Sequence, residues 1–195
     1  MVMIRRLYDW TLGLAGDRRA PWALAAVSFI ESSVFPIPPD VLLIPMVMAD
    51  RRRAWAFAAI CTIASVAGGF AGYAIGYGLF ETLGRPILDF YGAMARFEEF
   101  SALYNEWGAW IVLMGGLTPF PYKVITIASG ATGLDLAVFT IASVVARGGR
   151  FFLVAGLIWY FGPPIQRWLE RNLGLATTIF FVCLIGGFLM IKFVF

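Results

Sequence analysis

Five ionisable residues lie inside apolar stretches of this 195-residue sequence: Glu31, Asp40, Lys123, Arg147 and Arg150. A charge that faces lipid costs about 2.5–3.5 kcal/mol, so five of them would cost about 12–17 kcal/mol, as much as the whole stability of a typical domain. We therefore expect these side chains to pair with one another or to line a water-filled cavity. Either arrangement inside a membrane is usually functional.

The composition indicates that the surrounding medium is a membrane. Hydrophobic residues make up 61% of the chain, charged residues make up only 14%, and the mean hydropathy is +0.81. A soluble domain of this size could not bury so much apolar surface, so we expect a single membrane domain over residues 1–195.

The residue types that are missing or isolated exclude several kinds of chemistry. The chain has no histidine, which excludes histidine bases and histidine-ligated zinc or haem. Cys61 and Cys183 lie in apolar runs without the spacing of a metal site or a disulfide framework. We therefore expect no cofactor, no metal and no enzyme, and the net charge of +3 is too small to indicate nucleic acid.

Three segments have the length of a membrane-crossing helix: 54–80, 136–161 and 174–195. The first is free of charge and would be about 40 Å long as a helix, against a hydrocarbon core of about 30 Å. Its glycines would let one of its faces approach another backbone closely. The second carries Arg147 and Arg150 near its middle, so it is not a simple apolar span.

Two further apolar segments, 20–53 and 109–134, are interrupted by prolines. Proline removes a backbone donor and clashes with the preceding helical turn, so each segment is expected to form two short helices that meet at a proline-rich tip. Such a re-entrant hairpin enters and leaves on the same side of the membrane, and protein or water must cover its broken backbone. The tip prolines are Pro36, Pro38, Pro39, Pro119 and Pro121.

Basic residues outside these segments indicate the orientation. Residues 1–19 and 85–107 are expected to form amphipathic helices at the membrane surface, the second on the outer side, and no cleavable signal is expected at the amino end. The positive-inside rule places the N-terminus in the cytoplasm. The cytoplasmic group would be Arg5, Arg6, Arg18, Arg19, Arg51, Arg52, Arg53, Arg167 and Arg171.

The chain contains an apparent internal repeat. A shift of 83 residues aligns Phe35–Ile44 with Thr118–Ile127, and both segments contain Pro-x-Pro-x-charge-Val. One full crossing separates the copies, so the second hairpin would enter from the opposite face, as in transporters with inverted repeats. The predicted fold is an all-α integral membrane protein, an inverted repeat of re-entrant hairpin plus transmembrane helix, with a further C-terminal transmembrane helix. Chance prolines between apolar runs are the alternative.

The three cations indicate a site for an anion. Two carboxylates against three cations leave one surplus positive charge, which would attract an anion in a cavity of low dielectric. Arg147 and Arg150 lie on one helix face at i and i+3, and guanidinium groups bind two phosphate oxygens at once. Lys123 would add a point charge near the tip of the second hairpin. The alternative is that internal ion pairs only hold the hairpins together.

The two acids are candidates for proton coupling. Glu31 and Asp40 lie on opposite limbs of the first hairpin, so the hairpin could bring them together. Two carboxylates in a poorly solvated place tend to share a proton. If each acid instead forms a salt bridge to an arginine, no proton need move, and the sequence leaves both arrangements open.

Several motifs resemble the DedA family of bacterial membrane proteins, which is related to the VTT or SNARE-associated-domain proteins of eukaryotes. The resemblance covers roughly residues 20–165 and rests on Phe29-Ile30-Glu31, Phe35-Pro36-Ile37-Pro38-Pro39-Asp40, Gly68-Gly69 to Tyr77, Leu117-Thr118-Pro119-Phe120-Pro121-Tyr122-Lys123 and Ser129-Gly130-Ala131. It implies a lipid transporter with two opposed re-entrant hairpins. Several members move undecaprenyl phosphate and are linked to the proton motive force, and eukaryotic relatives look like phospholipid scramblases.

The resemblance also implies roles for single residues. Glu31 and Asp40 match the hairpin acids of the family. Lys123 stands where many members have the second arginine of an Arg-x-x-Pro-x-x-Arg motif, but the first arginine would fall near Leu117, and Arg147 with Arg150 would replace the missing charge. In this respect the chain resembles the YqaA-like branch.

The expected function is a transporter or flippase of an anionic lipid headgroup in the bacterial inner membrane. Its partners would be undecaprenyl (polyprenyl) phosphate or a phospholipid, together with protons, and no oligomeric state is indicated. A proton-coupled transporter of a soluble ion or drug and a non-transporting membrane assembly factor are the alternatives. A lipid-modifying enzyme is disfavoured, because no serine or cysteine lies beside a base.

Overall fold

The computed structural model describes residues 19–33, 38–118 and 120–171, with side chains as far as Gly162. Within these ranges the chain is all-helical and contains no strand. The predicted segments 1–19, apart from Arg19, and 174–195 lie outside the described residues, as do the tip prolines Pro36 and Pro119.

The first proline-interrupted segment forms two short helices, α2 (Ala20–Ser33) and α3 (Asp40–Ala49). They would be about 21 Å and 15 Å long, and each is shorter than the hydrocarbon core of a bilayer. α3 starts directly after Pro39, whose φ of −65° suits the residue before a helix. A 3₁₀ turn, η1 (Arg51–Arg53), then leads into the long helix α4 (Ala54–Leu79).

α4 is packed closely by both hairpins along its glycine face. Gly68 lies against the backbone of Phe29 in α2, and Gly76 lies against the backbone of Ile127, further along the chain. A Cβ at Gly72 would touch both Thr126 and the carbonyl of Ser32. The prediction that this face approaches another backbone closely is therefore confirmed.

The helical path continues beyond α4 through a π-helical turn, η2 (Phe80–Gly84), into α5 (Arg85–Phe90). After a turn come α6 (Met94–Glu106), α7 (Gly108–Leu117), α8 (Tyr122–Ala131) and α9 (Leu136–Arg171). The predicted single helix over 85–107 is thus two helices, because the chain turns at Gly92 with φ +61°, a conformation that glycine adopts without strain. α9 is kinked at Gly162, where φ and ψ are 2° and −82°.

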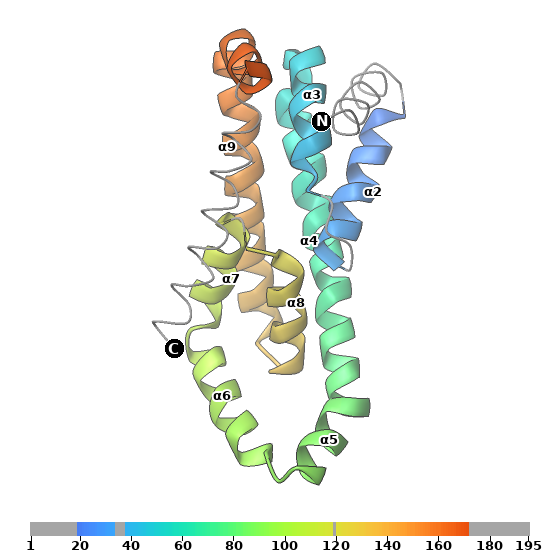
Figure 1. Ribbon diagram of the computed structural model, residues 1–195, viewed down its shortest axis with the longest axis vertical. Helices are drawn as coiled ribbons and strands as arrows, with labels where there is room; N and C mark the ends of the chain where they lie inside the picture. Colours follow the sequence, from blue (N-terminus) through green and yellow to red (C-terminus); the bar gives the residue numbers. More distant parts are fainter. Residues whose placement is uncertain (1–18, 34–37, 119, 172–195) are drawn as a thin grey trace.

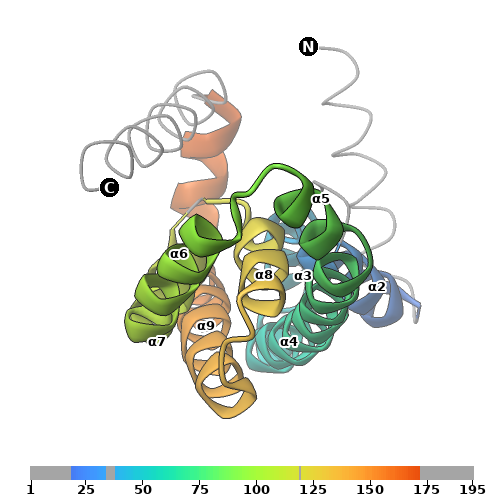
Figure 2. The ribbon, with the colours of Figure 1, turned by 90° about the horizontal axis from the view of Figure 1, so that it is seen from below.

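The two hairpins approach each other from opposite ends of the long helices (Figure 1). The α2–α3 pair lies along one half of α4 and α9, the α7–α8 pair lies along the other half, and their connecting ends meet near the middle. Seen from below, α8 lies between α4 and the α6–α7 limb (Figure 2). α4 packs against α2, α8 and α9, while α9 also packs against α3 and α7.

The apolar core is divided into two clusters, one for each hairpin. One cluster joins α2 and α3 to α4 and the far part of α9, and includes Leu24, Leu43 and Phe151. The other joins α6, α7 and α8 to the near part of α9, and includes Val112 and Phe139. Along α9 both arginines lie between these clusters, so the charged residues occupy the layer where the hairpins meet.

Within the described ranges, two helical runs are long and apolar enough to cross a membrane: Arg51–Phe90, with 40 residues, and Leu136–Gly162, with 27 residues. They contain the predicted crossing helices 54–80 and 136–161. Large apolar side chains along both runs are exposed at the protein surface, among them Ile63, Ile141 and Leu153. An apolar exterior of this kind is typical of a protein that is surrounded by lipid.

Candidate functional site

Four of the five predicted site residues meet in two ion pairs. Arg147 Nη2 lies 2.7 Å from Glu31 Oε2, and Arg150 Nη2 lies 2.6 Å from Asp40 Oδ2. Both pairs join the first hairpin to α9, across more than 100 residues of sequence. Of the two arrangements that the sequence left open for the acids, the structure therefore has the salt bridges to arginine.

The Glu31–Arg147 pair is enclosed by a ring of hydrogen bonds. Arg147 Nε donates to Ser65 Oγ on α4, and Ser65 Oγ lies 2.7 Å from Ser32 Oγ. Ser32 Oγ in turn donates to Glu31 Oε2 at 3.2 Å. The Arg147 side chain is 1% exposed, so this guanidinium is held by its partners within the protein.

Two aromatic rings complete the environment of Arg147. The guanidinium carbon lies 4.8 Å from the ring centre of Tyr122 and 4.7 Å from that of Phe151, both within the range of a cation–π interaction. The Tyr122 hydroxyl donates to Ser143 Oγ at 2.6 Å, which fixes the ring. Because Tyr122 begins α8, Arg147 connects the first hairpin, α4, α9 and the second hairpin.

The Asp40–Arg150 pair lies at the ends of both hairpins and is less enclosed. Arg150 Nη1 donates to the carbonyl of Thr118 at 3.3 Å, so one guanidinium bridges the start of α3 and the end of α7. Its two side chains are 18% and 20% exposed. The second oxygen of Asp40, Oδ1, is buried and has no hydrogen-bond partner among the described residues.

Lys123 is the surplus cation. It is the second residue of α8, its side chain is partly buried, and it makes no salt bridge within the part of the chain that the structure describes. Two acids are matched by two arginines, and among the described residues Lys123 shares no ion pair or hydrogen bond with these four side chains, so its part in the site stays a prediction.

The prolines set where the hairpins turn. Pro39 is fully buried directly before α3, and Pro121 holds an extended conformation, with φ −62° and ψ 102°, directly before α8. Pro38 is the first described residue of the connection to α3. Each hairpin therefore delivers a charged residue, Asp40 or Lys123, at the start of its second helix.

Sequence reasoning missed several polar and aromatic contributors. Ser65, Tyr122 and Phe151 contact Arg147, but a serine in a small-residue helix and aromatics beside charged residues are common in membrane proteins and indicate no partner. Tyr122 lies within the Pro-Tyr-Lys motif, and this motif was the one feature of the sequence that could have indicated a role for it at the site. No cluster of potential metal ligands is present among the described residues.

The fold and these paired charges together define an all-helical protein with two runs long and apolar enough to cross a membrane, whose described helices are interrupted beside ionisable residues. The VTT domain matches residues 37–160, which include four of the five ionisable residues predicted for the site, all except Glu31. This chain belongs to the VTT-domain, or DedA, family.

Two relatives extend the match beyond that domain. An uncharacterized protein of Haemophilus influenzae is 35% identical over 173 residues, which is 89% of this chain and 90% of that protein. An uncharacterized protein of Histophilus somni is 33% identical over the same length and the same shares of both chains. No solved structure matches the chain.

Proposed function

We propose that this protein is a membrane transporter of lipids that carry an anionic phosphate headgroup, either a polyprenyl phosphate or a phospholipid. The headgroup would bind where the two hairpins meet, while the lipid tails stay in the bilayer. The observation that carries this function is the single guanidinium of Arg150 bonded to both hairpins, and Lys123, the second residue of α8, would add a further cation.

This function requires that the two hairpins, α2–α3 and α7–α8, are re-entrant and enter the membrane from opposite sides. Four helices, α2, α3, α7 and α8, have only 10–14 residues each, and the two pairs point toward each other (Figure 1). Broken backbone at membrane depth is tolerated where it lines a cavity or is covered by protein. Placing the arginine-rich η1 end in the cytoplasm of a bacterial cell follows from the positive-inside rule.

Arg150 and Lys123 are the phosphate ligands in this mechanism. Arg150 donates from Nη2 to one carboxylate oxygen of Asp40 and from Nη1 to the carbonyl of Thr118, and a phosphate oxygen can take the place of that carboxylate oxygen. Lys123 has no ion-pair partner to displace within the ranges that the structure describes. Binding of an anion beside these two cations would therefore compensate the surplus charge.

Asp40 acts as the switch. Its oxygen Oδ1 has no partner among the described residues, so protonation there would break no existing hydrogen bond. A protonated Asp40 no longer neutralises Arg150, which is then free for a phosphate, and loss of the proton would return Arg150 to Asp40 and release the lipid. This cycle would couple lipid movement to a proton gradient.

The sequence predicted Arg147 as a phosphate ligand, and we propose a structural role for it instead. Its side chain is 1% exposed, and Glu31 and Ser65 already occupy donors on it. We therefore assign the Glu31–Arg147 pair to holding the first hairpin against α4 and α9, and not to the direct contact with phosphate.

Transport in purified vesicles tests this function. Wild-type protein in liposomes is expected to move labelled undecaprenyl phosphate or phospholipid between leaflets, and Arg150→Gln and Lys123→Gln are each expected to lower the rate by about tenfold or more. Arg96→Gln, an exposed arginine of α6 that takes no part in the site, is the matched control. Equal rates in all four proteins would exclude the headgroup site, and phosphate uptake without lipid movement would exclude a lipid substrate.

A further inference from the structure

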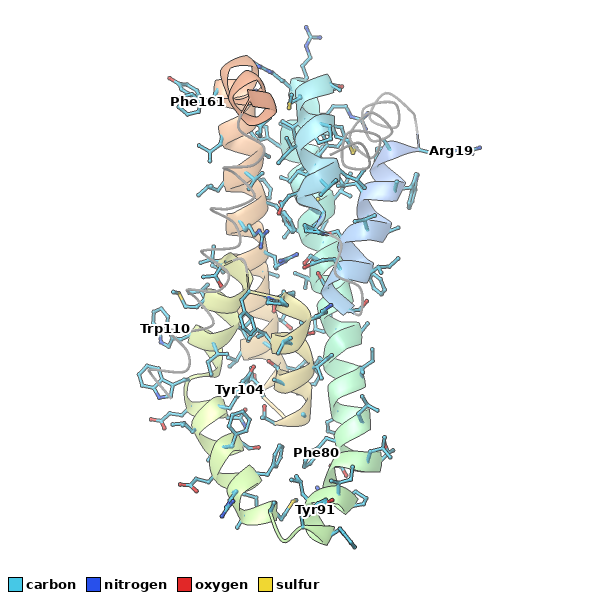
Figure 3. The ribbon with its side chains drawn as sticks, viewed as in Figure 1. Arg19, Phe80, Tyr91, Tyr104, Trp110 and Phe161 are labelled. Atoms are coloured by element: carbon cyan, nitrogen blue, oxygen red, sulfur yellow. The ribbon has the colours of Figure 1, made fainter. Side chains whose placement is uncertain are left out.

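An open surface cavity, of about 330 Å³, lies away from the ion pairs, at the end of the molecule where α4 continues into η2 and α5. Its walls come from this limb, from α6 and from the residues that follow α8. Phe80 and Tyr91 mark this end of the molecule, and Tyr104 lies further along α6 (Figure 3). We call it the α5–α6 cavity. Its size suits a small molecule or the head of a larger one.

The charges and dipoles of the α5–α6 cavity favour a cation. Glu81 and Glu98 line it with a single basic residue, Arg85, and Arg85 already pairs with Glu81 at 3.1 Å. Glu98 makes no ion pair within the described part of the chain. The C-terminal end of α8 also lies in the wall, at Thr132, and the dipole of a helix is negative at that end.

The remaining walls fit the carbon skeleton of an organic cation. Tyr77, Phe80 and Phe97 line the cavity, and the rings of Phe80 and Phe97 are stacked with centres 4.4 Å apart. Aromatic rings attract ammonium groups and also cover alkyl carbon. The π-helical turn, which starts at Phe80, is a local distortion of a kind found frequently at functional sites.

We propose that the α5–α6 cavity is a binding site for an organic ammonium ion, with an N–H group directed to Glu98 and the carbon skeleton against Tyr77, Phe80 and Phe97. The ammonium could belong to a soluble amine or to an aminophospholipid headgroup, because both present the same chemistry. This site is separate from the phosphate site and does not depend on the proposed transport.

Binding of 2-phenylethylammonium to the full chain in phosphatidylglycerol nanodiscs, measured by calorimetry against empty nanodiscs, tests the site. Wild-type protein is expected to bind this amine, and to bind the uncharged 2-phenylethanol much more weakly. Glu98→Gln is expected to weaken binding of the amine by about fivefold, which is the upper end for an exposed charge pair.

The neighbouring acid provides the control. Glu99→Gln removes the same charge from the next residue of α6, outside the cavity wall, and is expected to leave the affinity unchanged. Equal affinity of wild type and Glu98→Gln, or equal affinity for the amine and the alcohol, would overturn the proposal. Replacing part of the lipid by phosphatidylethanolamine distinguishes the two sources: competition with the amine identifies the lipid headgroup, and an unchanged affinity identifies a soluble amine.

Discussion

The two ion pairs use the same residue types and lie three residues apart on α9, yet their surroundings differ. Arg147 is sealed between two aromatic rings and a serine, whereas Arg150 bonds to a carboxylate and a backbone carbonyl and is 18% exposed. Arg147 is hard to separate from Glu31, because its buried guanidinium would be left without water, although Glu31 itself is 16% exposed. Both members of the Asp40–Arg150 pair are partly exposed, so we propose that the first pair is a fixed joint and that the second can exchange one partner for another.

The largest effect is expected from Arg147→Ala. It leaves the Glu31 carboxylate without its counter-ion and removes a guanidinium that fills the space between two rings, so the free energy of unfolding should fall by about 3–5 kcal/mol. Denaturant unfolding in detergent measures it. Glu31→Gln combined with Arg147→Gln should recover part of the loss, and a loss below about 1 kcal/mol for Arg147→Ala alone would show that the pair is not a fixed joint.

A smaller loss of stability is expected from Arg150→Gln, about 1.5–3 kcal/mol, the range for hydrogen bonds to charged groups. For this variant the transport rate should fall by more than the fraction of folded protein does. The measurement is the transport rate per folded molecule, with unfolding followed on the same sample. If Arg150→Gln destabilised the protein as much as Arg147→Ala, the two pairs would be equivalent.

Ser65→Ala should lower the free energy of unfolding by about 1–2 kcal/mol, because it removes the acceptor of Arg147 Nε and the partner of Ser32. Thr140→Ala is the matched control: its hydroxyl donates only to the carbonyl of Leu136 in its own helix. That control should change the stability by less than about 0.5 kcal/mol. Equal effects of the two substitutions would mean that the hydrogen bonds of Ser65 do not hold Arg147 in place.

The smallest effect on stability is expected from Lys123→Gln, within about 0.5 kcal/mol, since no ion pair within the described residues is lost. Titration with inorganic phosphate should nevertheless show weaker binding than in the wild type. A large loss of stability would assign Lys123 to the structure of the hairpin, and unchanged phosphate affinity would remove it from the site.

Much of the fold follows from local signals in the sequence. Pro39 and Pro121 start α3 and α8, and Gly68 and Gly76 mark where another backbone touches α4, because each of these residues constrains the chain at its own position. The turn at Gly92 was missed, since an amphipathic pattern continues on both sides of it.

The pairing of the charges could not be predicted in the same way. Which acid meets which arginine depends on how far the first hairpin extends along α9, and this register is set by packing between elements more than 100 residues apart. The inequality of the two pairs depends on Tyr122 and Ser65, which come from two further helices. The sequence therefore predicted the charged residues, but it did not predict the different roles that we propose for the two ion pairs.

Gly72 touches both halves of the molecule at one point. A single added methyl group there would clash with the Thr126 side chain of α8 and would touch the carbonyl of Ser32 at the end of α2, to which the Thr126 hydroxyl donates. The two hairpins therefore meet α4 and each other at one position. If the proposed transport tilts one hairpin, this contact would move the other with it, and opening on one side of the bilayer would be coupled to closing on the other at this glycine.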